Sequence, residues 1–226
     1  MLDDRPTLLL IRHGSTDWNS GPASEPTPER IRGWANPSLN ADGKAEASRA
    51  AKALSDESLS KIYTSDLNRA AYLAAQIYQK NEGKPPLKAT KDLRPWNVGK
   101  WAGELVKEVM PKMLVYQLEK PTVPAPGGEA FNDFLKRFLP YFEDRLEEAK
   151  KSEGAVILVS HTRNLRAADA WLKAGMTGLE TDKSIFRAKD HIKTGNAIKL
   201  TWNEGKWRRE EVPLGDKVAM KRTGTE

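Results

Sequence analysis

Two of the three histidines in this 226-residue chain come shortly after apolar runs. His13 lies two residues after Thr7–Ile11, and His161 lies two residues after Ala155–Val159. A short, continuous apolar run favours a buried strand of a parallel sheet. Parallel strands end at the same edge of a sheet, and open α/β sheets bind their ligands outside that edge. We therefore expect both imidazoles at one site beyond the strand ends.

Arginines accompany these histidines. Arg12 directly precedes His13, and Gly14 after it allows close backbone approach. Arg69 lies about one turn into a helix expected after a third strand, Lys61–Thr64. Guanidinium groups are the preferred fork for phosphate oxygens, and helix N-termini favour anions. One imidazole can attack phosphorus while the arginines offset the charge on the equatorial oxygens, so these residues predict a site for a phosphate dianion.

The composition excludes several other kinds of site. The chain has no cysteine, which excludes disulfides, a thiol nucleophile and cysteine zinc ligands. A three-histidine metal centre would need every histidine of the protein. Metal ligands of these types are therefore scarce. The net charge of +6 is assigned mainly to a solvated lysine-rich surface, and nucleic acid is not an expected partner.

No segment for membrane insertion or export is recognisable. The longest apolar runs are far shorter than the roughly 20 residues that span a bilayer. The stretch Met1–Pro6 is polar and acidic, unlike a signal peptide. We expect a cytoplasmic protein that contacts no membrane.

The rest of the chain alternates strand-like and helix-like patterns, which favours an α/β fold with a mostly parallel sheet. A further strand is expected at Ala197–Trp202, with a returning strand around Trp207. Helices are expected at Ala41–Leu54, Asp66–Lys80, Leu105–Leu118, Glu129–Lys151 and Thr162–Lys173.

Two prolines and one polar pair predict details of these helices. We expect Pro111 to divide its helix into two pieces, Pro140 to kink the longer helix, and Ser65-Asp66 to cap the helix that holds Arg69. A single domain over residues 1–226 follows, with a loose tail at about residues 214–226.

A series of ordered motifs carries a family resemblance. The segment Leu10–Asn19, with Arg-His-Gly at its centre, resembles the signature of the histidine phosphatase superfamily, also called the phosphoglycerate mutase-like family. Further motifs follow in the family's order, and they are Arg32-Gly33-Trp34 with Pro37-Ser38-Leu39 and Gly43, Ser65-Asp66-Leu67 with Arg69-Ala70, Gly99–Gly103, Pro126–Glu129 and Leu158–His161. The resemblance covers about residues 7–202 and implies a three-layer α/β/α architecture with a small helical lid at about residues 103–126.

The resemblance also implies roles for single residues. His13 would be the nucleophile that becomes phosphohistidine, and His161, Arg12 and Arg69 would complete the catalytic set. Phosphate or substrate contacts are implied for Asn19, Thr16, Arg32, Gly33 and Thr162. The implied enzyme is a phosphoric monoester hydrolase of the histidine acid phosphatase type that needs no metal and no cofactor. Its implied partner is a small phosphorylated substrate. A homodimer is left open.

One departure from the family pattern concerns the general acid. Pro95 occupies the position of the usual acidic Glu, and Thr162 follows the second histidine where the family's other arrangement has Asp. A proton donor typically supplies about 10²–10⁴-fold in rate. Three interpretations stay open. Glu104 or Glu129 substitutes as the acid, the substrate has a good leaving group, or the chain is a catalytically weak phosphate-binding module.

The lid and one insertion supply the last expectations. Phosphoglycerate mutases carry a longer lid with paired arginines, whereas Gly103–Pro126 holds no arginine. We therefore favour hydrolysis, with a mutase-like phosphotransferase as the alternative. Ser20–Arg30 lengthens the loop near the pocket, and Arg30 and Arg32 either reach an anionic substrate or stay solvated. The residues left over are Trp96 and Trp101, which are candidates for lining the site, and His191, which is assigned to the surface.

Overall fold

The two apolar runs that precede the histidines form neighbouring strands in the middle of a six-stranded sheet in the computed structural model, which describes residues 2, 4–20, 26–187 and 192–216. β1 (Thr7–Arg12) and β4 (Ala155–Ser160) are parallel, and every residue of both is buried. The sheet order is β3-β2-β4-β1-β5-β6. The other strands are β2 (Leu59–Ser65), β3 (Leu87–Thr90), β5 (Ala197–Asn203) and β6 (Lys206–Val212).

The pairing directions confirm a mostly parallel sheet. β2 runs parallel to both β4 and β3, while β5 is antiparallel to β1 and to β6. The predicted strands around the two histidines, at Lys61–Thr64 and at Ala197–Trp202 are all present, and the returning strand at Trp207 is β6.

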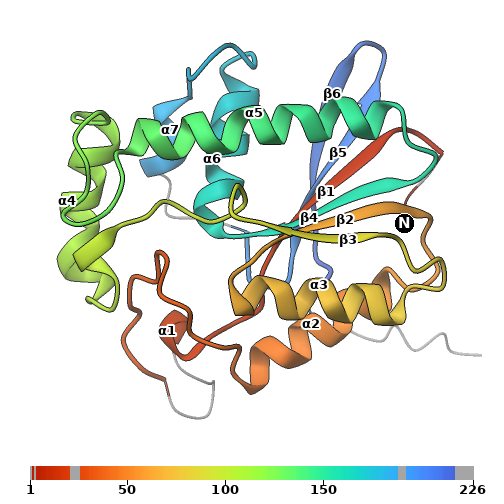
Figure 1. Ribbon diagram of the computed structural model, residues 1–226, viewed down its shortest axis with the longest axis horizontal. Coiled ribbons are helices and arrows are strands. Elements are labelled where there is room, and N and C mark those ends of the chain that lie inside the picture. The colour runs from red at the N-terminus through yellow and green to blue at the C-terminus, as the bar shows by residue number, and fades with distance from the viewer. Residues whose placement is uncertain (1, 3, 21–25, 188–191, 217–226) are drawn as a thin grey trace, which may run out of the picture.

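Helices cover both faces of the sheet, so the three-layer α/β/α architecture is confirmed (Figure 1). Leu9 and Ile11 of β1 pack on one face with α2 (Ala41–Ala53) and α3 (Asn68–Lys80). Leu8 and Leu10 point the opposite way, because strand side chains alternate, and pack with the aromatic side chains of the other layer. That layer consists of α5 (Phe131–Lys150) and α6 (Thr162–Lys173).

The predicted lid is helical. α4 (Val106–Leu118) lies away from the sheet and contacts α7 (Lys183–Arg187), a short helix that the sequence did not indicate (Figure 1). The other elements absent from the expectations are α1 (Asp17–Ser20), the 3₁₀ turn Gly99–Trp101 and β3. All of these are short, and β3 is largely exposed, so none carries an extended apolar pattern.

One expectation about prolines was wrong, because α4 runs continuously through Pro111 instead of dividing there. α5 also runs continuously through Pro140, and the kink expected at that residue stays a prediction. Each proline lies on the exposed side of its helix, as does the residue four positions earlier. Water can therefore take the carbonyl that each proline leaves without a helical donor.

The capping and tail predictions also need correction. α3 begins at Asn68, its N-cap is Leu67 without a side-chain hydrogen bond, and Asp66 instead pairs with Arg94 at 2.6 Å. The tail is not loose at Leu214, because that side chain is buried and the amide of the next residue donates to the Asn196 side chain. Residues 217–226 lie outside the described residues. Within the described part of the chain, no helix has the length and apolar character needed to cross a membrane.

Candidate active site

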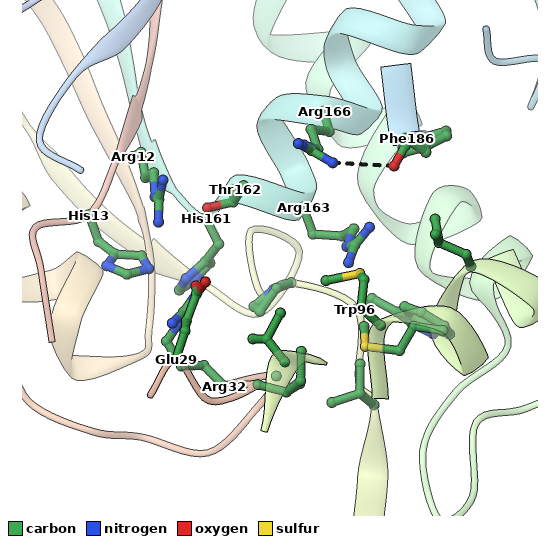
Figure 2. A pocket seen from close by; sticks show the side chains of 18 of the residues that line it. Arg12, His13, Glu29, Arg32, Trp96, His161, Thr162, Arg163, Arg166 and Phe186 are labelled. Carbon is green, nitrogen blue, oxygen red and sulfur yellow. Dashed lines mark hydrogen bonds and ion pairs between the residues drawn. The ribbon is translucent and has the colours of Figure 1, made fainter. Parts of the chain in front are cut away.

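The register between β1 and β4 brings the two histidines together. Arg12 lies opposite Ser160, and the His13 amide donates to the Ser160 carbonyl at 3.0 Å. The next residue on each strand is the histidine, so the two imidazole centroids lie 5.1 Å apart with their planes at 60°. Both rings are buried, with 2% and 3% of their surfaces exposed. The expected convergence at the carboxyl ends of the strands is confirmed (Figure 2).

The hydrogen bond of His13 defines its proton position. Nδ1 lies 2.7 Å from the Gly14 carbonyl oxygen. A carbonyl oxygen can only accept, so Nδ1 carries the proton and Nε2 keeps its lone pair. Burial, followed by the charges of Arg69 and Arg12, lowers the pKa of His13 well below its ordinary value of 6.5. A neutral imidazole with a free Nε2 lone pair is the form that can act as a nucleophile.

His161 has the opposite proton position. Arg69 Nε lies 3.2 Å from His161 Nδ1, and because the guanidinium can only donate, Nδ1 is the acceptor. The proton of the neutral ring is therefore on Nε2, a buried atom that finds no hydrogen-bond partner among the described residues. Burial and then Arg69 lower the pKa of His161 well below 6.5. The site thus holds a buried N–H donor that a bound ligand or a water molecule can use.

Arg69 and Arg12 are held by backbone carbonyls rather than by carboxylates. Arg69 donates through Nη1 to Ala35 O at 2.7 Å and through Nη2 to Gly33 O at 2.9 Å. Arg12 donates through Nη1 to Ile192 O at 2.7 Å. Burial, followed by the charge of Arg32, lowers the pKa of each guanidinium to about 9. Two buried cations that form no ion pair within the described chain favour an anionic ligand.

Gly14 is required by close packing next to His13. A Cβ at Gly14 would lie 2.4 Å from the carbonyl oxygen of Gly43, at the start of α2. A Cβ at Gly43 would lie 2.0 Å from Ser15 O. The expected close backbone approach at Gly14 is confirmed, and it fixes the His13 loop against α2.

A cavity of about 460 Å³ opens beside the histidines, within the size range of small-molecule sites. Of the predicted contact residues, Arg32, Gly33 and Thr162 line this cavity. The lid contributes an apolar wall of Val106, Met110, Met113 and Leu114. The first turns of α6 contribute Arg163 and Arg166, and α7 contributes Phe186 and Arg187.

Thr16 and Asn19 do not line the cavity. Asn19 Oδ1 accepts from the Thr16 amide at 3.0 Å and from its hydroxyl at 2.9 Å. These bonds close the loop that follows His13. A direct phosphate contact by either residue stays a prediction.

Neither of the expected acids faces the histidines. Glu104 is exposed, and its backbone carbonyl accepts from the Ile31 amide. Glu129 Oε1 accepts from the Asn97 amide and from Arg137 Nη2, both at 2.8 Å, so its carboxylate braces the neighbouring loop. Neither glutamate is among the residues that line the cavity, and both expectations are corrected.

Pro95, in the position of the usual acid, does line the cavity. Trp96 beside it also lines the cavity and donates to the Glu129 carbonyl at 2.9 Å. Trp101 does not line the cavity, and its ring centroid lies 6.2 Å from that of Trp96. Arg30 points away and donates to the Gly103 carbonyl. His191 lies outside the described residues.

Glu29 is one of the cavity residues that the sequence did not indicate, as are Arg163 and Arg166. It is the only carboxylate among the described residues that line the cavity, and Arg32 Nη2 donates to its Oε1 at 3.1 Å. One signal was present, because Glu29 lies inside the insertion and three residues before the Arg-Gly-Trp motif. Among the described residues, no group of three or more His, Asp or Glu side chains could hold a metal ion.

Comparisons with known proteins agree on the fold. Residues 8–212 match the histidine phosphatase superfamily (branch 1). A 2,3-bisphosphoglycerate-dependent phosphoglycerate mutase from Bartonella henselae is 30% identical over 204 residues, which is 87% of this chain and 92% of the relative. The structure of a mycobacterial glucosyl-3-phosphoglycerate phosphatase superposes with a TM-score of 0.69 at 22% identity, over 91% of this chain and 97% of that one. The alpha-ribazole phosphatase from Shigella flexneri gives a TM-score of 0.69 at 22% identity, over 92% and 96% of the two chains.

Proposed function

Because this chain belongs to the histidine phosphatase superfamily, we propose that it hydrolyses a phosphomonoester through a phosphohistidine intermediate on His13. The observation that carries the proposal is the opposite proton placement on two adjacent imidazoles. His13 presents a lone pair on Nε2, His161 presents an N–H on Nε2, and both rings line one cavity. A nucleophile and a donor for a phosphate oxygen are therefore present together.

The first half-reaction transfers the phosphoryl group to the enzyme. The substrate dianion binds between Arg12, Arg69 and the Nε2–H of His161. His13 Nε2 attacks phosphorus, a P–N bond forms, and the P–O bond to the leaving group breaks. The leaving-group oxygen takes up a proton. The fixed cations and the N–H donor offset the charge on the equatorial oxygens without reorganising, which is the main catalytic contribution expected for phosphoryl transfer.

The second half-reaction releases phosphate. Water attacks the phosphorus of phospho-His13, the P–N bond breaks, and the water loses a proton. All steps use side chains of the chain itself, so we propose a metal-independent hydrolase. The cytoplasmic location and the homodimer stay predictions.

The rest of the cavity suits a substrate with an apolar body and a second anionic group. The lid wall is apolar, and Arg163 donates to Gln117 of α4 at 2.7 Å, where α6 meets the lid. Burial, followed by the charges of Arg166 and Arg32, lowers the pKa of Arg163 to about 10. Arg163 forms no ion pair with a described carboxylate, so an anionic substituent would relieve its charge.

A mutase is the second candidate because the Bartonella henselae relative bears that name. A mutase returns the phosphoryl group to another hydroxyl, so it has to retain the acceptor while the phosphohistidine persists. The lid segment itself, Gly103–Pro126, has no arginine, so among the described residues the arginines at this end of the cavity come only from α6 and α7. This absence favours water as the acceptor and hydrolysis as the reaction.

A trapping experiment tests the proposed function. Brief incubation with ³²P-labelled substrate should place an acid-labile, base-stable label on His13, followed by release of inorganic phosphate. Isomerised phosphoester without free phosphate would support the mutase. An unlabelled wild type, together with equal activity of the His13→Ala variant, would overturn both enzymatic candidates and leave the phosphate-binding module.

A further inference from the structure

We propose that Glu29 is the general acid that protonates the leaving-group oxygen, taking over the role of the glutamate that Pro95 replaces. The inference rests on the proposed function. Glu29 is the only carboxylate among the described cavity residues, and in Figure 2 its side chain points toward the imidazoles beside Arg32. Its charge also acts on Arg12, raising the pKa of that guanidinium against the effect of burial.

Pro95 cannot supply the proton. It lines the cavity, but proline carries no ionisable side chain and no backbone N–H. The wall that normally carries the acid therefore has no donor at this position. Glu29 enters the same cavity from a different part of the chain, the insertion between β1 and α2.

The backbone of Glu29 is fixed against the start of the lid. Its carbonyl accepts from the Val106 amide at 2.9 Å, and the next residue, Arg30, forms an antiparallel bridge with Leu105. The Arg30 amide donates to the Trp18 carbonyl at 3.0 Å. A residue with this backbone support keeps its place beside the site instead of moving with a free loop.

Only one of the two carboxylate oxygens of Glu29 has a hydrogen-bond partner among the described residues. Arg32 donates to Oε1 of Glu29, and the other end of the guanidinium is fixed by the Trp18 carbonyl at 2.7 Å. Oε2 makes no hydrogen bond within the described chain. This oxygen is available to a leaving group, while Arg32 acts as the positioning residue.

An acid that acts in every turnover has to exchange its proton with water. One oxygen of Glu29 lies 3.1 Å from Arg32 Nη2. The side chain is 37% exposed, so it can take a proton from water.

The proton balance closes over the two half-reactions. Glu29 gives its proton to the departing alkoxide as the P–O bond breaks, and becomes a carboxylate. It then accepts a proton from the water that attacks phospho-His13, which restores the acid. The same residue serves as acid and then as base.

The experiment compares Glu29→Gln with wild type on phosphomonoesters whose leaving groups span a wide pKa range. Phosphorylation of His13 by an alkyl phosphate should slow by about 10²–10⁴-fold in the variant. With 2,4-dinitrophenyl phosphate, whose leaving group needs no proton, the rate should fall by less than about threefold. The plot of log rate against leaving-group pKa should therefore be nearly flat for wild type and steep for Glu29→Gln.

Glu104→Gln is the matched control. Glu104 lies in the loop segment that bonds to Ile31 and does not line the cavity, so this variant should keep the wild-type slope. The Glu29→Asp variant should recover part of the lost alkyl-phosphate rate. An unchanged slope in Glu29→Gln, or an equal loss with every leaving group, would overturn the acid role. A wild type that forms no phospho-His13 from 2,4-dinitrophenyl phosphate would instead overturn the proposed function itself.

Discussion

The two ends of the cavity are built from different kinds of element. At the phosphate end, His13 and His161 follow adjacent parallel strands, and their partners are the Gly14 carbonyl and the Arg69 guanidinium. At the lid end, the side chains come from α4, α6 and α7, and most of the α4 wall is apolar. The register of the strands determines where the side chains of the phosphate end lie. The packing of the helices determines where the side chains of the lid end lie.

This difference separates chemistry from substrate choice. Each of the four side chains at the phosphate end is held by at least one hydrogen bond to backbone or to a neighbouring site residue. The lid end presents side chains whose exchange changes shape and charge without touching the histidines. Substitutions at the phosphate end should therefore act on every substrate, and substitutions at the lid end should discriminate between substrates.

His13→Ala gives the largest expected effect. Nε2 of His13 is the proposed nucleophile, so the variant should lose turnover by roughly 10⁴-fold or more for all substrates. Release of inorganic phosphate measures this. Turnover within about tenfold of wild type would show that another group attacks phosphorus and would remove the basis of the comparison.

His161→Ala should cost roughly 10²–10³-fold in kcat, which is typical of removing one donor to a developing charge. The loss should be similar for substrates with and without a second anion, because Nε2–H contacts the transferring group. Steady-state kinetics with both kinds of substrate check this. A loss confined to one kind of substrate would contradict the assignment of His161 to the phosphate end.

Arg163→Met tests the lid end of the cavity. The ratio of kcat/KM for 3-carboxy-4-nitrophenyl phosphate over 4-nitrophenyl phosphate should fall by about 10–100-fold, in line with about 1.5–3 kcal/mol for a hydrogen bond to a charged group. Lys112→Met removes an exposed cation of α4 that does not line the cavity, and it should leave the ratio unchanged. An unchanged ratio in Arg163→Met would assign Arg163 to bracing Gln117 only.

The smallest expected effect is on stability at mildly acidic pH. The pKa values of His13 and His161 are lowered in the folded state, so the unfolded chain binds more protons below about pH 6.5. The stabilising contribution of the neutral rings is present above that pH and is lost as the pH falls toward the folded-state pKa values. The Tm should therefore drop on acidification, and it should drop less in a variant with both histidines changed to Gln. Equal acid sensitivity of the two proteins would contradict the buried, neutral state of the rings.

The phosphate end could be predicted from the sequence because its signals are local. His13 and His161 each follow an apolar run, and neighbouring parallel strands need only the correct register to bring them together. Arg69 was found in the same way, at the start of a helix after a strand. The corresponding fold features, a mostly parallel sheet covered by helices on both faces, follow from the alternation of these patterns.

The acid could not be predicted in this way. Glu104 and Glu129 are close in sequence to the motif position, but sequence distance does not tell which side of the backbone faces a cavity. Glu29 reaches the site because its segment pairs with the start of the lid at the bridge between Arg30 and Leu105, a contact between positions far apart in the chain. The predicted break at Pro111 was wrong for a related reason. Whether water reaches the carbonyl that the proline leaves without a donor depends on packing and not on residue type.

The contact between Gly14 and Gly43 has a consequence for how this protein can vary. A Cβ at Gly14 would collide with the Gly43 carbonyl, and a Cβ at Gly43 would collide with the Ser15 carbonyl. Neither glycine can therefore be replaced while the backbone of the other segment stays in place. The loop that carries His13 and the first turn of α2 therefore hold each other in place at the end of the sheet. A laboratory library that varies either glycine alone would lose the position of His13 before it altered any reacting group.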